Sequence, residues 1–430
     1  MNYYQEEIET ICRDELLKWQ NKLFCKQVKN VYKNVPYYKK KIDSMQIDIS
    51  DIKGIEDSCK LPYMTKDDLQ QAYPDGLLAV PKSDCVRIQS TSGTTGKRII
   101  AYYTKKDIEI WEECCARAIV AAGGTKDDVC QVSYGYGLFT GGAGLNGGAQ
   151  KVGCLTLPMS VGNTQRQLQF MIDLNTSILC CTPSYAANLG ESILKKGLKN
   201  KINLRAGIFG AEPWTNEMRN HIEEMLSIDA YDIYGLTEMM GPGVAFECTE
   251  KNGMHIQEDH FYAEIINPNS GEVLQEGEIG ELVLTSLSKQ AFPLIRYRTG
   301  DLCKIITGKC TCGRTHIRMS KPLGRCDDMI IVKGVNVWPT QIESVLLDMG
   351  YSSNYLIVVD REDNRDALYI DVETELDLKD EDKIKHEREK IENGIKGMLG
   401  IKVNVNLVEW ETIQRNEGKA KRVIDKRRLY

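Results

Sequence analysis

Ser90-Thr91-Ser92-Gly93-Thr94-Thr95-Gly96-Lys97 is the stretch that says most about how this chain folds. It combines hydroxyl side chains, two glycines and a lysine, which suits a loop whose N–H groups, hydroxyls and ammonium surround a triphosphate. A polar surface turn has a similar composition, so the stretch alone leaves both interpretations open. A Walker-type P-loop needs GxxxxGK followed by Ser or Thr, whereas Arg98 follows Lys97 and the two glycines stand too close together. A Walker fold is therefore disfavoured.

The segments around this loop predict an α/β protein. Short apolar runs each lead into a turn and a helical pattern, which is typical of parallel strands with crossover helices. These runs are residues 130–133, 177–180 and 206–209. Residues 262–306 alternate like strands of an antiparallel sheet or a small β-barrel-like part. We expect a large N-terminal domain of mixed parallel and antiparallel sheets with helices, residues 1–326, whose first 80 residues form helices with loops. We expect a small mobile C-terminal α+β domain, residues 327–430, with the order strand, helix from Pro339, strand, strand, helix and strand.

Composition excludes several classes of protein. With 430 residues, 42% hydrophobic and 27% charged, the chain is globular rather than disordered. A net charge of −6 offers no overall attraction to nucleic acid or anionic membranes, and no window is apolar enough to span a bilayer. The start of the chain lacks the features of a signal peptide, and fifteen scattered cysteines indicate reduced thiols. We expect a cytoplasmic protein, with a homodimer as one alternative for its assembly.

Five motifs in the same order resemble those of the adenylate-forming superfamily, which contains acyl-CoA synthetases, luciferases and the adenylation domains of peptide synthetases. They are residues 90–97, Tyr234-Gly235-Leu236-Thr237-Glu238, Tyr297-Arg298-Thr299-Gly300-Asp301, Gly324-Arg325-Cys326-Asp327-Asp328 and Gly418-Lys419-Ala420-Lys421-Arg422. A narrower resemblance, to the phenylacetate–CoA ligase family, rests on four further segments. These are residues 134–142, Gly210-Ala211-Glu212-Pro213-Trp214, Gly241-Pro242-Gly243-Val244-Ala245 and Gly334-Val335-Asn336-Val337-Trp338-Pro339.

The resemblance implies an ATP-dependent acid–CoA ligase that converts an aryl carboxylate, ATP and coenzyme A into acyl-CoA, AMP and diphosphate through an acyl-adenylate. Two alternatives share the nucleotide motifs: an adenylyltransferase, and an adenylation enzyme that loads a carrier protein. A non-catalytic nucleotide-binding or zinc-scaffold protein is a third. Loss of Glu238 or Lys419 would mark that third class, and this sequence keeps both residues.

The resemblance also implies roles for individual residues. Lys419 is the adenylation lysine, and Glu238, next to Thr237, holds Mg²⁺ on ATP, as one or two carboxylates commonly do. Asp301 accepts hydrogen bonds from the ribose and Tyr234 faces the adenine. The complete set of expected ATP-binding residues is Ser90, Ser92, Gly93, Thr94, Thr95, Gly96, Lys97, Gly210, Ala211, Glu212, Pro213, Asp232, Tyr234, Gly235, Thr237, Asp301 and Arg325.

Residues 134–153 contain eight glycines, a density that predicts close backbone approach and argues against a packed helix or strand. In the family this segment lines the acid pocket, so Tyr136 and Phe139 are expected to form walls around an aromatic acid. An ordinary core position is the alternative for both rings. Gly141, Gly142 and Pro242 complete the expected pocket. Leu145-Asn146-Gly147-Gly148 departs from the family pattern, which leaves an acid other than phenylacetate open.

Two further groups of residues complete the expectations. The family pattern implies that the small domain rotates about Asp327 and presents Lys333, Gly334 and Val335 to coenzyme A. Separately, Cys248, His255, Cys310 and Cys312 supply the ligand types of a closed structural zinc site. His260 and His316 compete for the imidazole position, and in a cysteine-rich chain neighbouring cysteines carry less weight than usual.

Overall fold

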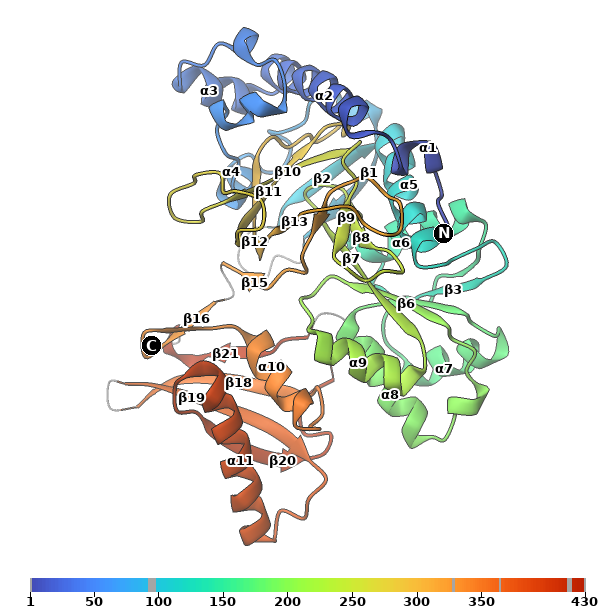
Figure 1. The fold of residues 1–430 in the computed structure, drawn as a ribbon, viewed down its shortest axis with the longest axis vertical. Coiled ribbons are helices and arrows are strands. Elements are labelled where there is room, and N and C mark those ends of the chain that lie inside the picture. Colours follow the sequence, from blue (N-terminus) through green and yellow to red (C-terminus); the bar gives the residue numbers. More distant parts are fainter. Residues whose placement is uncertain (1, 92–97, 327–328, 363–364, 416–419, 429–430) are drawn as a thin grey trace.

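The structure is a computed structural model that describes residues 2–91, 98–326, 329–362, 365–415 and 420–428. Figure 1 shows two groups of elements, one below the other along the longest axis of the molecule. We call the group from α1 to β15 the N-terminal unit, and the group from β16 to η5 (Lys426–Arg428) the C-terminal unit. Predictions that concern residues 92–97, Asp327 or Lys419 fall outside the described residues.

The first eighty or so residues form helices joined by turns, as predicted. They comprise α1 (Glu6–Glu9), α2 (Arg13–Asn34), α3 (Pro36–Ser44), α4 (Lys66–Gln71) and the 3₁₀ turns η1 (Ile49–Asp51), η2 (Ile55–Lys60) and η3 (Lys82–Asp84). Helix α2 buries a stripe that includes Leu16, Phe24 and Val31, spaced by about two turns, so its apolar face packs on the core. Pro36 occupies the first position of α3, where its missing N–H costs nothing.

A nine-stranded sheet forms the centre of the N-terminal unit, in the order β13-β14-β9-β8-β7-β6-β5-β3-β4. Its strands are β3 (Val129–Val132), β4 (Leu155–Leu157), β5 (Ile178–Cys181), β6 (Ala206–Gly210), β7 (Asp229–Leu236), β8 (Gly241–Glu247), β9 (Met254–Ile256), β13 (Ile305–Ile306) and β14 (Arg318–Met319). Strands β4, β3, β5, β6 and β7 pair in parallel, and the remaining pairs are antiparallel. Strands β5 and β6 are buried along their whole length, which explains their unbroken apolar sequence.

Five helices accompany this sheet: α5 (Lys105–Ala121), α6 (Thr140–Val152), α7 (Thr164–Asp173), α8 (Pro183–Lys195) and α9 (Asn216–Leu226), with the short turn η4 (Lys199–Lys201). Helix α6 corrects one prediction, because the glycine-rich segment does form a packed helix. A Cβ added at Gly144 would lie 2.5 Å from Nε1 of Trp111, and one added at Gly148 would lie 2.4 Å from Cβ of Cys115. The glycines therefore let α6 approach α5 closely, and this packing offsets their low helix propensity.

An antiparallel sheet lies beside the central one, in the order β10-β11-β12-β15. Its strands are β10 (Phe261–Ile266), β11 (Gly280–Ser286), β12 (Tyr297–Cys303) and β15 (Gly324–Arg325). This region was predicted as antiparallel sheet or small barrel, and its described strands form an antiparallel sheet. Strands β1 (Cys85–Ser90) and β2 (Ile100–Thr104) form a separate antiparallel hairpin. Residues 91–99, which include most of the predicted phosphate loop, lie between these two strands in the sequence.

The C-terminal unit has the predicted order of strand, helix, strand, strand, helix and strand, with two further strands. Its elements are β16 (Ile330–Val332), β17 (Val335–Val337), α10 (Pro339–Asp348), β18 (Tyr355–Glu362), β19 (Arg365–Thr374), α11 (Glu381–Leu399), β20 (Asn404–Glu409) and β21 (Val423–Asp425). The main sheet has the order β20-β19-β18-β21. Strand β21 escaped prediction because three residues among charged neighbours show no apolar period.

One hydrophobic core belongs to the C-terminal unit, and its buried residues all lie between Ile330 and Val405. The other three cores belong to the N-terminal unit, except that Leu347 of α10 packs against the core around α8 and α9. Figure 1 accordingly shows α10 beside α9, where the two units meet. Among the described residues, no helix is both long and apolar enough to cross a membrane.

Candidate active site

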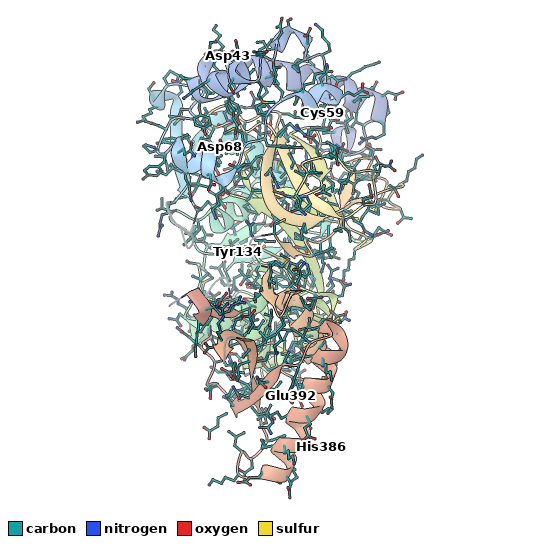
Figure 2. All side chains as sticks on the ribbon, turned by 90° about the vertical axis from the view of Figure 1, so that its left-hand side faces the viewer. Asp43, Cys59, Asp68, Tyr134, His386 and Glu392 are labelled. Atoms are coloured by element: carbon teal, nitrogen blue, oxygen red, sulfur yellow. The ribbon has the colours of Figure 1, made fainter. Side chains whose placement is uncertain are left out.

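Several of the predicted nucleotide- and acid-binding residues lie in loops at one edge of the central sheet. Strands β3, β5, β6 and β7 run parallel, so the loops that follow them leave the sheet at the same edge, where open α/β sheets usually bind ligands. These loops are residues 133–139, Thr182 before α8, residues 211–215 and residues 237–240. Figure 2 shows Tyr134, in the first loop, about midway along the molecule, between Asp43 and His386 near its two ends.

Ser90, the first residue of the predicted phosphate loop, lies at this edge. Its backbone N–H donates to the carbonyl of Leu138 at 2.8 Å, so the end of β1 lies against the loop that follows β3. Its hydroxyl donates to the carbonyl of Thr91 at 3.1 Å. Residues Ser92, Gly93, Thr94, Thr95, Gly96 and Lys97 lie outside the described residues, so their predicted role in phosphate binding stays a prediction.

The turn after β7 carries Thr237 and Glu238 and is fixed by two side chains that the sequence did not single out. Oη of Tyr103 donates to the carbonyls of Thr237 at 3.2 Å and Met240 at 3.0 Å. Nζ of Lys289 donates to the carbonyl of Glu238 at 3.2 Å and lies 4.4 Å from the centre of the Tyr103 ring. Tyr103 and Lys289 therefore fix the backbone of the predicted metal-binding turn by hydrogen bonds to its carbonyls.

Burial shapes the charges around this turn. The side chain of Glu238 is buried, and desolvation raises its pKa above the ordinary value. Lys289 is fully buried, and desolvation lowers its pKa to about 8. A carboxylate in such surroundings gains from a nearby cation, which is consistent with the predicted Mg²⁺ on Glu238. The hydroxyls of Thr237 and Thr140 are 3.4 Å apart, so the turn also touches the first residue of α6.

Tyr234, Asp301 and Arg325 form a connected group. Oη of Tyr234 donates to Oδ2 of Asp301 at 2.6 Å, and Nη1 of Arg325 donates to Oδ1 at 3.0 Å. Asp301 on β12 and Arg325 on β15 face each other across neighbouring strands. The structure thus brings together three predicted nucleotide residues that lie far apart in the sequence. Tyr234 is itself buried, and Gly235 beside it admits no side chain, because an added Cβ would lie 1.9 Å from the carbonyl oxygen of Gly241.

Asp232 lies further back on β7 in a charged, buried cluster. Its N–H donates to Oε2 of Glu247 at 2.8 Å, and Nη2 of Arg219 donates to both oxygens of Glu247 at 2.8 and 2.7 Å. Burial raises the pKa of the Asp232 carboxyl, and Lys321 opposes that rise. Nζ of Lys321 also lies 3.9 Å from the centre of the ring of Trp214, a residue of the loop after β6. Asp232 is therefore a buried carboxyl whose pKa depends on the charges of its neighbours Lys321 and Glu247.

Gly210 ends β6, and the loop Ala211-Glu212-Pro213 that follows it contacts the C-terminal unit. Gly210 lies so close to β7 that an added Cβ would be 2.1 Å from the carbonyl oxygen of Ile233. Ala211 has a φ of 72°, a left-handed conformation that costs energy in a residue with a side chain. Glu212 accepts the N–H of Ser184 at 2.8 Å and the N–H of Ala420 at 3.0 Å. Ala420 directly follows Lys419, which lies outside the described residues.

The predicted acid-pocket residues lie around the start of α6. Oη of Tyr136 donates to Oδ1 of Asn146 at 3.4 Å, whereas Phe139 is 47% exposed and so is not a core residue. Cβ atoms added at Gly141 and Gly142 would lie 3.0 Å from Tyr134 and 2.8 Å from the carbonyl oxygen of Gly135, respectively. The carbonyl of Pro242 accepts from Nε1 of Trp111 at 3.1 Å and from Sγ of Cys115 at 3.2 Å. Pro242 thereby ties β8 to α5.

The predicted coenzyme A residues form the tight turn between β16 and β17. Val332 pairs with Val335, so Lys333 and Gly334 are the two turn residues, with φ of 53° and 79°. Positive φ at both positions is typical of hairpin turns that match strand twist. The N–H of Lys333 donates to Oδ2 of Asp366 at 3.4 Å. This turn belongs to the C-terminal unit, and the predicted hinge residue Asp327 lies outside the described residues.

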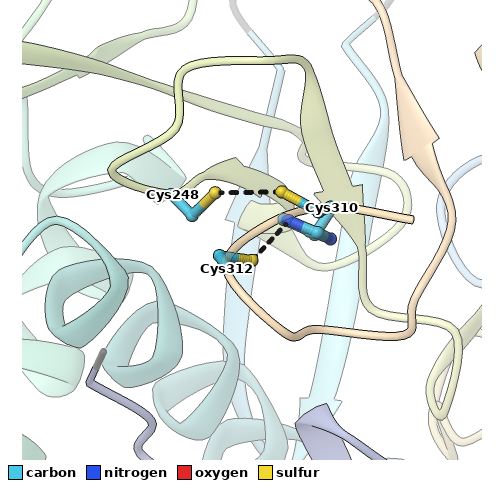
Figure 3. A group of neighbouring side chains, drawn as sticks. Cys248, Cys310 and Cys312 are labelled. Carbon is cyan, nitrogen blue, oxygen red and sulfur yellow. Dashed lines mark hydrogen bonds between the residues drawn. The ribbon is translucent and has the colours of Figure 1, made fainter. Parts of the chain in front are cut away.

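The four predicted metal ligands come together away from this edge. The ligand atoms of Cys248, His255, Cys310 and Cys312 all lie within 4.8 Å of one another, and all four residues are buried. Figure 3 shows Cys248 and Cys310 turned toward each other and Cys312 turned toward the imidazole. The two sulfur atoms of the first pair are 3.7 Å apart, and Sγ of Cys312 is 3.4 Å from Nε2 of His255.

These spacings fit a tetrahedral zinc ion. With Zn–S near 2.3 Å and Zn–N near 2.0 to 2.1 Å, tetrahedral geometry requires S···S of about 3.8 Å and S···N of about 3.6 Å. Nδ1 of His255 lies 3.1 Å from the carbonyl of His316, which fixes the ring with its Nε2 toward the thiols. His316 therefore supports the ligand instead of replacing it. His260 bonds Ser288 at 2.9 Å and is not in the group.

Comparison with known proteins identifies the class. The chain matches the AMP-binding enzyme family over residues 6–288 and the AMP-binding enzyme C-terminal domain over residues 334–427. It is 45% identical to the phenylacetate-coenzyme A ligase of Pseudomonas putida over 98% of this chain and 97% of that enzyme. It is 42% identical to the enzyme of the same name from Thermus thermophilus, over 99% of this chain and all of that enzyme.

A solved structure agrees with this class. The 2-hydroxyisobutyryl-CoA ligase in its postadenylation state, with bound R3-HIB-AMP, matches with a TM-score of 0.92 and 26% identity over 99% of this chain and 93% of that one. The fold and the site thus define an adenylate-forming enzyme. Within that class the chain belongs to the phenylacetate–CoA ligase family, and it is an AMP-forming acid–CoA ligase that uses ATP and coenzyme A as substrates.

Proposed function

We propose that this ligase activates an aromatic carboxylic acid, phenylacetate or a close analogue. The observation that carries the proposal is identity of 42–45% over nearly the whole chain to four ligases named for phenylacetate. The exposed ring of Phe139 at the site edge supports it, because an apolar side chain left half in water there gains from an apolar ligand. Tyr136, from the same loop, would form a second wall.

In the first step, a carboxylate oxygen of the acid attacks the α-phosphorus of ATP, and the bond to the β-phosphate oxygen breaks. Diphosphate leaves and an acyl-adenylate remains. Glu238 would hold Mg²⁺, which neutralises phosphate oxygens when bound, and Lys419 would stabilise the charge that builds up between the acid and the α-phosphate. Asp301 and Tyr234 would fix the ribose and adenine, so positioning accounts for much of the rate.

In the second step, the thiolate of coenzyme A attacks the acyl carbon and AMP leaves. The C-terminal unit would first turn about Asp327, withdraw Lys419 and bring the turn of Lys333, Gly334 and Val335 toward coenzyme A. The TM-score of the present structure is 0.92 against the relative in its postadenylation state and 0.73 against the same relative in its thioesterification state. The described arrangement is therefore closer to the first of those two states.

The test is release of diphosphate across arylacetic, benzoic, indole-acetic and aliphatic acids, with and without coenzyme A. We expect an arylacetic acid to give the highest kcat/KM and coenzyme A to convert the adenylate to thioester. A preference for 2-hydroxyisobutyrate or another aliphatic acid would contradict the aromatic pocket. Phe139→Ala should raise KM for the acid several-fold with little change in KM for ATP, because the lost contact is apolar and local.

We also propose a structural Zn²⁺ at Cys248, His255, Cys310 and Cys312. Three thiols and an imidazole close the tetrahedron, which leaves no position for a reacting group. Oη of Tyr3 donates to the carbonyl of Cys312 at 2.6 Å, so the site would also anchor the start of the chain. Elemental analysis of protein never exposed to chelator should find about one zinc per chain, and less than half an equivalent would contradict the site. None of the fifteen cysteines is in a disulfide, and we propose the cytoplasm as the compartment because thiols stay reduced there.

A further inference from the structure

Two carboxylates of the N-terminal unit bind the segment of the C-terminal unit that flanks Lys419, one on each side. Glu212 accepts the N–H of Ala420 at 3.0 Å, immediately after the lysine. Glu191, on α8, lies 3.8 Å from Nη2 of Arg415, four residues before the lysine. Nothing in the known reaction requires Glu191, and no sequence motif contains it.

Glu191 makes further contacts across the same boundary. Its Oε1 accepts from the hydroxyl of Ser352 at 3.2 Å and from Nδ2 of Asn354 at 3.0 Å, both in the loop before β18. Burial raises the pKa of Glu191. Because the carboxylate is partly removed from water, each of its contacts contributes more free energy than the same contact of a surface charge. One side chain of α8 thus joins two separate segments of the C-terminal unit.

Arg415 transmits this contact to the lysine segment. Its guanidinium donates to both oxygens of the buried Glu373 at 2.7 Å each, a bidentate pair that fixes its orientation. The N–H of Ile413 donates to Glu373 as well, at 2.8 Å. Residues 413–415, which precede Lys419 in the sequence, are therefore fixed within the C-terminal unit, and Glu191 contacts Arg415 from the N-terminal unit.

Glu212 is fixed equally well on its own side. Its other oxygen accepts the N–H of Ser184 at 2.8 Å, in the first turn of α8, where free N–H groups favour a carboxylate. The two carboxylates therefore come from different elements, Glu191 from the body of α8 and Glu212 from the loop after β6, which is bonded to the first turn of α8. Their partners Arg415 and Ala420 precede and follow Lys419 in the sequence.

We propose that Glu191 and Glu212 are positioning residues for adenylation: through Arg415 and Ala420 they clamp the C-terminal unit against the N-terminal unit, and they release it before thioester formation. The clamp depends on the proposed role of Lys419. It acts in one half-reaction, because its contacts join the two units in the described arrangement, which is closer to a relative's postadenylation state than to its thioesterification state. A fold-stabilising role would instead affect both half-reactions alike.

The experiment separates the half-reactions in Glu191→Ala and the wild type, with phenylacetate for adenylation and supplied phenylacetyl-adenylate plus coenzyme A for thioester formation. We expect Glu191→Ala to lose about tenfold in adenylation, the scale of one charged hydrogen-bonding group, with thioester formation unchanged or faster. Glu212 is also one of the expected ATP-binding residues, so its part in the clamp is tested by hydrogen exchange. Glu191→Gln keeps an acceptor for Ser352 and Asn354 and should recover most of the rate.

Lys195→Ala is the matched control. Lys195 pairs with Glu411 at 2.8 Å across the same boundary, but both side chains are more than 60% exposed, and exposed pairs contribute little. This variant should keep near wild-type rates in both steps. A comparable loss in Lys195→Ala, an equal loss of both half-reactions in Glu191→Ala, or full adenylation activity in Glu191→Ala would each overturn the clamp.

Amide hydrogen exchange without substrates gives a second readout that does not depend on the identity of the acid. Exchange at Ala420 should speed up in Glu212→Ala. Exchange at Asn354, whose N–H donates to the Ser352 hydroxyl that Glu191 holds, should speed up in Glu191→Ala, with Lys195→Ala unchanged. If the wild type is inactive with phenylacetate but shows these exchange differences, the proposed acid is wrong and the clamp stands. Unchanged exchange in both variants would refute the clamp whatever the substrate.

Discussion

Replacement of Gly148 by alanine tests why α6 can be a helix at all. An added Cβ would lie 2.4 Å from Cβ of Cys115, 2.8 Å from its carbonyl carbon and 2.9 Å from N of Ala116, all on α5. Carbon atoms in contact normally lie about 3.5 to 4.0 Å apart, so α5 and α6 would have to separate by about 1 Å. Overpacking of this kind costs about 1 to 3 kcal/mol, more than the roughly 1 kcal/mol that alanine gains over glycine in a helix.

We therefore expect Gly148→Ala to lower the free energy of unfolding by up to about 2 kcal/mol, measured by urea denaturation. Gly397→Ala is the control, because Gly397 is helical and exposed in α11 and an added Cβ there would meet nothing within 4 Å. That change should raise stability by up to about 1 kcal/mol, the propensity gain alone. If Gly148→Ala is also stabilising, close packing against α5 is not the reason for glycine at this position.

Four further outcomes follow from the site and its surroundings. Glu238→Gln should abolish adenylation while thermal stability is kept, and near-normal turnover at saturating Mg-ATP would exclude it as the metal residue. Lys419→Ala should slow adenylation by on the order of 10² and leave thioester formation from supplied adenylate nearly unchanged; equal losses in the two steps would contradict domain alternation. Cys312→Ser should lower the zinc content and the melting temperature together, and a normal zinc content would exclude Cys312 as a ligand. Burial raises the pKa of Glu343 from 4.5 to about 7, so its contribution to stability is complete below pH 4.5 and is lost as the pH rises to about 7. Glu343→Gln should then stabilise the C-terminal unit at about pH 8 by on the order of 3 kcal/mol and have little effect at about pH 4, and an equal effect at both values would contradict the shift.

Local sequence predicted the elements that a local rule can describe. The buried strands β5 and β6 were evident from unbroken apolar runs, and the helix that begins at Pro339 was predicted as part of the element order of the C-terminal unit. Motif order was enough to indicate the class of enzyme, since the loop at 90–97 and the segments around Glu238, Asp301 and Lys419 keep their order along the chain. The proximity of Cys248, His255, Cys310 and Cys312 was also predicted, because the chemical types that can ligate zinc are few; that the group holds zinc stays a prediction.

Tertiary structure decided what depends on a partner distant in the sequence. Glycines count against a helix when read locally, and only the surface of α5 makes them favourable in α6. Glu191 has no motif, and its role is visible only because Ser352, Asn354 and Arg415 fold back onto α8. Packing likewise decides which histidine lies with the three cysteines: His255 is within 4.8 Å of them, whereas His260 bonds Ser288. The sequence determined which chemical groups this protein has and the order in which they come. Their contacts were decided by packing, because the free energy of a contact depends on both partners and on the water that they exclude.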